Sequence, residues 1–343
     1  MCSHFDEWAH ERAYLLANHI KTNLPAPEPI AVPDSNVRLI RYHIQSDNHP
    51  ADLTFILWSD LSIERKRQRL CYDNGFASIA EDPVIRKVCT DASPVKYFPT
   101  DIIPRASLNN SLKMTLMNDC FSDAVFYAGA SGRTIRESIR KALCVALSGG
   151  DRSNYDCGKP LNQGNITLVS ESLGSKVLFD SVACSDTRLG ADEDIKIQSQ
   201  QLSRLRSAVQ RVTNVYMLAN QLPILNLADQ DGVCPGKEES PLLAADVEKP
   251  GLKGFVDLAK PPIQIDRTEP LLGELQIVAF TDPNDLLSYR LVPDDAEPQQ
   301  RVKFVNVLSS NTGSFFNLFE WPITAHGGYK DNSAVIQILL WGN

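Results

Sequence analysis

The chain has 343 residues, and its 34 Lys and Arg residues against 42 Asp and Glu residues give a net charge of −8. This acidic balance argues against a protein that binds nucleic acid through bulk positive charge. Hydrophobic residues make up 43% of the chain and charged residues 22%, which is ordinary globular composition and excludes a disordered polar chain.

The predicted elements alternate between short runs rich in Val, Ile, Phe and Tyr and amphipathic helical stretches. The predicted strands are Arg38–Gln45, Thr54–Asp60, Asp123–Gly129, Ile166–Ser170, Asn214–Asn220, Gln276–Thr281 and Lys303–Ser309. The predicted helices are Phe5–Ile20, Arg133–Leu147, Leu202–Val212 and Ser333–Trp341. Because several strands are apolar almost throughout, this alternation predicts an α/β fold with a mostly parallel, twisted sheet flanked by helices.

We expect a single domain over residues 1–343, since no linker or internal repeat divides the chain. Two long stretches between predicted elements, residues 72–120 and 226–272, are expected to be lid or insertion segments. No apolar run reaches the roughly 18 residues of a membrane-spanning helix, so we expect no transmembrane segment. The first residues also lack the basic and apolar regions of a signal peptide, which leaves the localisation open.

The eight cysteines are spaced irregularly and include no Cys-x-x-Cys pair. We therefore expect neither a metal site nor a dithiol redox site. An even number of cysteines permits disulfides, and Cys144 with Cys157 would close a short loop. A chain of this size can fold without covalent cross-links, so buried thiols are the favoured expectation.

The segment Ile166–Phe179 combines a strand-like run, the sequence Ser170-Glu-Ser172-Leu-Gly174 and a helical run. A serine on such a strand-to-helix turn is typical of a nucleophile elbow, in which small residues two positions before and after the serine let the strand and the helix approach closely. Gly174 fits this rule, and Ser170 stands where glycine is usual. Ser172 is therefore the candidate nucleophile.

A serine hydroxyl needs an imidazole to take its proton and a carboxylate to orient that imidazole. Of the six histidines, only His326 follows Ser172 in the chain, and it is predicted to lie in a loop between the last strand and the last helix. Asp282 and Asp285 both follow the preceding strand and are candidates for the acid. Asp285 is favoured, because an aspartate directly before a proline, as Asp282 is, has an ordinary role in turns.

The order Ser172, Asp285, His326, each after a predicted strand, resembles the α/β-hydrolase superfamily in its serine esterase and lipase branch, over roughly residues 120–343. The resemblance implies the α/β-hydrolase fold, with Ser172 as the acylated nucleophile and His326 as base and then acid. It further implies Asp285 as the orienting carboxylate and the N–H of Leu173 as one oxyanion donor. The implied substrate is a small-molecule or lipid carboxylic ester, and no cofactor is required.

In this superfamily, a loop after a strand that precedes the first helix donates the second oxyanion N–H. Here the first predicted helix begins at Phe5, so that strand is expected to be missing before residue 1. The backbone of Met1 or Cys2 is one candidate donor, and the segments Trp58–Asp60 and Asn220–Gln221 are others.

Two alternative functions remain open from the sequence. An acyltransferase would use the same three residues and pass the acyl group to an alcohol in place of water. A non-catalytic α/β-hydrolase-like module would bind a partner or an apolar ligand, and the departure at Ser170 fits that alternative. The apolar stretch Phe315–Trp321, just before His326, is a candidate lining for an acyl pocket.

Overall fold

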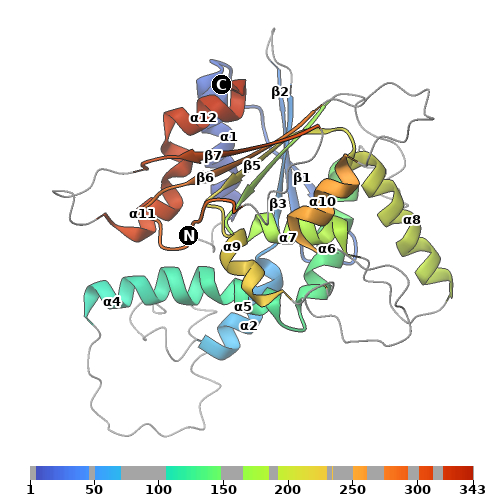
Figure 1. Cartoon of the computed structure of the whole chain (residues 1–343), viewed down its shortest axis with the longest axis horizontal. Helices are drawn as coiled ribbons and strands as arrows, with labels where there is room; N and C mark the ends of the chain where they lie inside the picture. The colour runs from blue at the N-terminus through green and yellow to red at the C-terminus, as the bar shows by residue number, and fades with distance from the viewer. Residues whose placement is uncertain are drawn as a thin grey trace, which may run out of the picture.

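Figure 1 shows a computed structural model of the chain, in which two β-sheets are surrounded by helices. The structure describes residues 5–45, 51–70, 106–147, 165–184, 192–229, 234, 250–260, 274–292, 301–311 and 320–342.

Four parallel strands form one sheet, in the order β4 (Ile166–Glu171), β5 (Val212–Leu218), β6 (Leu275–Thr281) and β7 (Val302–Leu308). The apolar strands β5 and β6 are buried over nearly their whole length, as expected for strands covered on both faces. Parallel strands all end at the same edge of their sheet, which is where ligands bind in α/β proteins. The residues that follow β4, β6 and β7 therefore meet at one edge.

Helices cover both faces of the parallel sheet (Figure 1). Three of them contact one another on one face: α7 (Gly174–Ala183), α8 (Asp192–Val209) and α10 (Gly251–Ala259). On the other face, α12 (Ser333–Trp341) packs Val335 against Tyr216 and Phe280 of the sheet. The predicted α/β character is thus confirmed. The predicted helix Leu202–Val212 ends earlier, at Val209, because Val212 begins β5.

A second sheet is antiparallel, with the strand order β1 (Glu28–Ala31), β2 (Arg38–Ile44) and β3 (Ala51–Leu57). The helix α1 (Phe5–His19) packs on it through Ala9 and Ala13, whose small side chains are fully buried against Tyr42 of β2. The single, mostly parallel sheet that we predicted is therefore replaced, among the described strands, by one parallel and one antiparallel sheet.

The described elements between β3 and β4 along the chain are helices. They are α2 (Asp60–Leu70), α4 (Ser107–Ser111), the π-helix η2 (Leu112–Phe121), α5 (Ser122–Ala128) and α6 (Gly132–Leu147). The predicted strand Asp123–Gly129 is wrong, since these residues form α5. Its Val, Phe and Tyr residues favour a strand by composition, but Asp123 and Tyr127 are buried at helical spacing while Val125 is exposed.

The two predicted insertion segments are described in part. Residues 107–120 of the first lie in α4 and η2, and residues 71–105 lie outside the described residues. The second contains the short helix η3 (Asn226–Ala228), which follows α9 (Leu222–Leu225), and also contains α10. Two further short helices, α11 (Pro322–Gly327) and η4 (Gly328–Asp331), precede α12.

The preference for buried thiols over disulfides is wrong for three cysteines. Cys184, at the end of α7, and Cys234 form a disulfide with a Cα–Cα distance of 6.0 Å. Cys144 is also disulfide-bonded, whereas Cys120 is not. Cys184 and Cys234 are 50 residues apart, so their proximity depends on the tertiary fold and leaves no local signal in the sequence.

Candidate functional site

Ser172 lies on a tight turn between β4 and α7. Its φ angle is 57°, in the left-handed region that residues other than glycine rarely adopt. Its backbone N–H donates to the carbonyl oxygen of Leu218 on β5 at 2.8 Å, which holds the turn against the sheet. A strained serine between a strand and a helix is the geometry of a nucleophile elbow.

The two small residues around Ser172 differ in their contacts. Ser170 is buried, and its hydroxyl lies 2.9 Å from the hydroxyl of Ser175, so a side-chain hydrogen bond joins β4 to α7. A Cβ added to Gly174 would meet no described atom within 4 Å. The prediction that Gly174 is required for close approach of the strand and the helix is therefore wrong.

Asp285 and His326 form a buried pair at the carboxyl edge of the parallel strands. Asp285 follows β6, and His326 lies in α11, which follows β7. The Nδ1 atom of His326 lies 2.9 Å from each carboxylate oxygen of Asp285. With a carboxylate as acceptor, Nδ1 carries the proton and Nε2 remains a base. The predicted loop position of His326 is wrong, because Pro322 opens a short helix there.

Asp282, the other candidate acid, braces the backbone near the site. Its Oδ1 accepts from the N–H of Asn284 at 2.9 Å, and its Oδ2 accepts from the N–H of Asn311 at 2.7 Å. The side-chain amide of Asn311 in turn donates to the carbonyl oxygen of Ala325 at 2.7 Å. Asp282 therefore ties the loop after β6 to the segment that carries His326, and Asp285 is the acid that contacts the imidazole.

Tyr329 is a site residue that no sequence pattern marks. Its hydroxyl accepts from the N–H of Asp282 at 2.7 Å and lies 3.3 Å from Oδ2 of Asp285 and 3.2 Å from Oγ of Ser288. Burial and the negative charge of Asp285 raise the pKa of Tyr329, so its hydroxyl stays protonated and can donate. The N–H of Leu287 also donates to Asp285, at 2.9 Å, and the carboxylate is fixed on both oxygens.

Several charges act on His326, whose side chain is 10% exposed. Burial, the largest single influence, lowers the pKa of the imidazole, but the hydrogen bond and charge of Asp285 together with the charges of Cys120 and Glu171 outweigh it, so the pKa of His326 is raised. Cys120 lies on η2, which contacts α11. Glu171 is the last residue of β4 and directly precedes Ser172.

The hydroxyl of Ser172 makes no hydrogen bond to His326 or to another described residue. Contacts between a serine nucleophile and its base are often long in ligand-free sites and shorten when substrate binds. The N–H of Leu173 likewise has no described partner. It stands at the N-terminus of α7, where unpaired N–H groups and the helix dipole favour a negative charge.

The candidates for the second oxyanion donor have different outcomes. Met1 and Cys2 lie outside the described residues, as does most of the apolar stretch Phe315–Trp321. The N–H of Asn220 donates to the carbonyl of Phe280 at 3.4 Å, and the Asn220 side chain donates to the carbonyl of Tyr289 at 2.7 Å. Asn220 therefore braces the loops at the sheet edge. The segment Trp58–Asp60 leads into α2.

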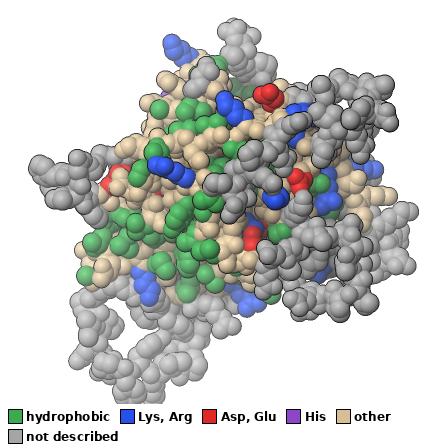
Figure 2. All heavy atoms as spheres, in the orientation of Figure 1, with side chains coloured by type: hydrophobic (Ala, Val, Ile, Leu, Met, Phe, Trp, Pro, Cys, Tyr) green, Lys and Arg blue, Asp and Glu red, His purple; other side chains and the backbone are tan. Residues whose placement is uncertain are grey.

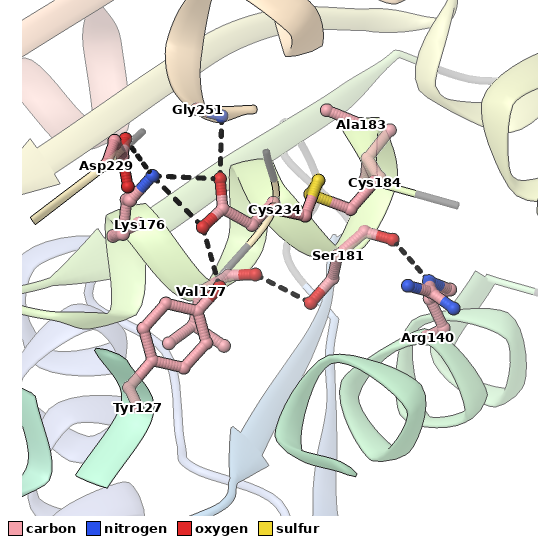
Figure 3. Close-up of a disulfide and its surroundings, with 12 residues drawn as sticks. Tyr127, Arg140, Lys176, Val177, Ser181, Ala183, Cys184, Asp229, Cys234 and Gly251 are labelled. Atoms are coloured by element: carbon pink, nitrogen blue, oxygen red, sulfur yellow. Dashed lines mark hydrogen bonds and ion pairs between the residues drawn. A yellow bond between two sulfur atoms is a disulfide. The ribbon is translucent and has the colours of Figure 1, made fainter. Parts of the chain in front are cut away.

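The helix α7, which follows Ser172, is anchored by a buried charged cluster (Figure 3). Asp180 accepts from the Lys176 ammonium at 3.1 Å, the Tyr127 hydroxyl at 2.7 Å and the Gly251 N–H at 2.6 Å, and Lys176 also contacts Asp229 at 2.6 Å. Burial and the charge of Asp180 raise the pKa of Tyr127, which therefore stays a donor. The cluster joins α7 to α5, to α10 and to the segment after η3.

Comparisons with known proteins do not place this chain in a family: no family model, curated protein or solved structure matches it. Within the described ranges, no group of three or more His, Cys, Asp or Glu side chains is arranged to hold a metal ion. None of the helices in those ranges combines the length and the apolar character needed to cross a membrane.

Proposed function

We propose that this chain is a serine hydrolase of carboxylic esters with the α/β-hydrolase fold, in which Ser172, His326 and Asp285 act together. The observation that carries the proposal is the buried Asp285–His326 pair at the sheet edge where the strained Ser172 also lies. Packing alone does not require a serine with an energetically unfavourable left-handed backbone, and it does not require a buried imidazole and carboxylate beside it. The order of the three residues along the chain supports the same fold.

In the proposed first step, the Ser172 hydroxyl attacks the carbonyl carbon of the ester while Nε2 of His326 takes the hydroxyl proton. A bond forms between Oγ and that carbon, and the alcohol then leaves with the proton from His326. In the second step, water attacks the acyl-enzyme with His326 again as base, and the carboxylic acid is released. Asp285 keeps the imidazole in the tautomer with Nε2 free and stabilises the imidazolium.

The N–H of Leu173 is the proposed first oxyanion donor. It belongs to the residue directly after the nucleophile, has no described partner and lies at the N-terminus of the ten-residue helix α7. A preorganised N–H at this position would bind the negative charge that develops on the carbonyl oxygen in the transition state.

Exposed apolar side chains support an ester with an apolar acyl group. Leu108, Met117 and Phe121 are 42%, 47% and 38% exposed, and they lie on α4 and η2. Figure 2 shows hydrophobic side chains on the face of the molecule that carries these helices. Exposed apolar area of this kind often marks a binding surface, and here it lies in part on η2, a helix that contacts α11, which carries His326.

The test is intact-mass analysis after incubation with a fluorophosphonate, which modifies activated serines. We expect one adduct on the wild type and none on Ser172→Ala, because removing Oγ removes the nucleophile. The matched control is Ser203→Ala, which removes an exposed hydroxyl on α8 and should keep the adduct. An adduct that persists on Ser172→Ala would contradict the proposed nucleophile.

Assays of the same wild-type protein distinguish the alternative functions. A wild type that forms the adduct with the fluorophosphonate and that, in the absence of this probe, converts ester and added alcohol mainly into a new ester, with little free acid, would be an acyltransferase. A wild type that neither forms the adduct nor hydrolyses a panel of esters with acyl chains of graded length would overturn the hydrolase proposal in favour of a binding module.

A further inference from the structure

Tyr329 belongs both to the core and to the proposed site. Its side chain is buried in an apolar cluster that includes Tyr216 and Phe280 of the parallel sheet. Its hydroxyl lies in hydrogen-bond contact with Asp285, the acid of the proposed triad. A phenylalanine would fill the same apolar space, so packing alone does not require a hydroxyl here. A buried hydroxyl beside the carboxylate therefore calls for another role.

The backbone holds Tyr329 and His326 in one short segment. Tyr329 is the second residue of η4, three positions after His326. Between them, Gly328 approaches Asn311 so closely that an added Cβ would lie 2.8 Å from the Cβ of Asn311. The side-chain amide of Asn311 also donates to the carbonyl oxygen of Ala325 at 2.7 Å. The segment that carries the imidazole and the phenol is thus fixed against the residues after β7.

The single proton of the Tyr329 hydroxyl has two candidate acceptors. The N–H of Asp282 already donates to the hydroxyl oxygen, at 2.7 Å. Oδ2 of Asp285 lies 3.3 Å from that oxygen, and Oγ of Ser288 lies 3.2 Å from it. Ser288 has a proton of its own, which it donates to the carbonyl oxygen of Asp282 at 3.2 Å. Because a charged carboxylate is the stronger acceptor, the Tyr329 proton is directed to Asp285.

The carboxylate of Asp285 then has a fixed donor on each oxygen besides the imidazole. Its Oδ1 accepts from the N–H of Leu287 at 2.9 Å, and its Oδ2 accepts from Tyr329. Nδ1 of His326 lies 2.9 Å from both oxygens, so rotation of the carboxylate would break this contact. An acid that orients an imidazole must itself be held in place.

We propose that Tyr329 is a positioning residue of this reaction, whose hydroxyl holds the carboxylate of Asp285 in the orientation that its contact with His326 requires. The inference rests on the proposed hydrolase function. A hydroxyl that donates to the carboxylate also stabilises its negative charge and weakens its attraction for a proton on the imidazole. Tyr329 therefore affects both the orientation of His326 and the pH at which His326 gains its proton.

Other charged or titratable groups on the elements around His326 are not hydrogen-bond partners of the Tyr329 hydroxyl. They are Cys120 on η2, Glu171 at the end of β4 with its partner Arg12 of α1, and Lys330 and Asp331 on η4. Removing that hydroxyl leaves their charges in place. A change in the titration of His326 would therefore report the contact between Tyr329 and Asp285.

The test removes only the hydroxyl. Tyr329→Phe should lower kcat for ester hydrolysis about tenfold and leave KM nearly unchanged, because it removes one hydrogen bond to a charged group of the proposed triad. The titration of His326 is followed by NMR, with His326→Ala for assignment, and by the pH profile of kcat/KM. In the wild type, we expect a midpoint above 6.5, the ordinary value for histidine. Tyr329→Phe should move the midpoint to higher pH.

The matched control is Tyr127→Phe. Tyr127 is also a buried tyrosine, and its hydroxyl donates to the buried carboxylate of Asp180 at 2.7 Å. Both variants should lose stability, because each leaves buried polar partners with one hydrogen bond fewer. Only Tyr329→Phe should change kcat and the midpoint of His326. A hydroxyl that merely stabilises the fold would make the two variants alike in both measurements.

If Tyr329→Phe fails to fold, a stronger donor at the same position provides the test. Replacing tyrosine by 3-fluorotyrosine throughout the chain makes every phenol more acidic and keeps every hydroxyl. Tyr329 is the tyrosine whose hydroxyl contacts Asp285 among the described residues. The midpoint of His326 should therefore move to lower pH, opposite to the shift in Tyr329→Phe. A midpoint that does not fall in the fluorinated protein would contradict the proposed contact.

An unchanged kcat in folded Tyr329→Phe, or a midpoint that does not rise, would overturn the role of Tyr329 and leave the hydrolase function standing. A wild type without adduct and without ester hydrolysis would overturn both proposals. The NMR titration separates these outcomes because it requires no turnover.

Discussion

Asp285 and Asp180 are buried aspartates with similar contacts, but they lie in different regions of the molecule. Each side chain is fully buried, accepts from a backbone N–H and contacts a tyrosine hydroxyl whose pKa is raised by burial. The partner of Asp285 is His326, which can exchange a proton near neutral pH and lies at the carboxyl edge of the strands. The partner of Asp180 is Lys176, one turn earlier on the same helix. A buried carboxylate therefore indicates a catalytic role only when its partner can exchange a proton and when the pair lies at an edge of the sheet where ligands bind.

The largest expected effect is at Asp285. Asp285→Asn should reduce kcat about 10⁴-fold, because an amide no longer enforces the tautomer that leaves Nε2 free. Steady-state ester hydrolysis measures this effect, and the unfolding curve in urea should change little. Asp282→Asn, which alters the backbone brace, should lose far less activity. Equal losses in the two variants would contradict the assignment of Asp285 as the acid.

Substitutions in the Asp180 cluster should change the free energy of unfolding and leave the activity unaffected. Lys176→Ala leaves Asp180 buried without its cation and should lower the free energy of unfolding by about 3–5 kcal/mol, as measured in urea. Activity per folded molecule should be kept. Lys303→Ala, at an exposed position on β7, is the control and should change stability by less than about 0.5 kcal/mol. A large loss of kcat in folded Lys176→Ala would contradict a purely structural role of the Asp180 cluster.

The disulfide next to this cluster should have a somewhat smaller effect. Replacing both Cys184 and Cys234 by serine removes a cross-link over 50 residues and should lower the free energy of unfolding by about 2–4 kcal/mol. The check is urea unfolding of the variant beside the oxidised wild type. Unchanged stability would show that the buried charges anchor α7 without the cross-link.

The smallest expected effect concerns the strain at the elbow. With its φ angle of 57°, residue 172 suits glycine better than alanine. Ser172→Gly should therefore be more stable than Ser172→Ala by about 1 kcal/mol, although both variants lack the proposed nucleophile. Thermal unfolding of the two variants measures the difference. A more stable alanine variant would argue against a strained turn.

The sequence predicts the parts of the site that depend on local order. Ser172 and Asp285 could be proposed because each follows an apolar run, and His326 because it is the only histidine after Ser172; strand ends in a parallel sheet share an edge. Most strand positions were predictable from the short apolar runs themselves. The segment Asp123–Gly129 was not, because a short apolar run fits a strand or a buried helix equally well.

The remaining features depend on contacts between distant segments. Arg12 reaches Glu171 across 159 residues, and Tyr329 contacts Asp285 across 44. Nothing in the neighbouring sequence distinguishes these side chains from ordinary surface or core residues. The π-helix η2, which contacts α11, also has no simple periodic signature.

The bridge between Cys184 and Cys234 has a practical consequence for recombinant production. Hosts that keep their cytoplasm reducing with glutathione and thioredoxin prevent such bonds from forming, so chain made there would lack this cross-link. Secretion, or an oxidising expression strain, with purification in buffers free of thiol reductants, should yield the cross-linked form. Protein prepared without these measures would carry Cys184 and Cys234 as thiols, which are buried in the fold and would react with alkylating reagents once the chain unfolds.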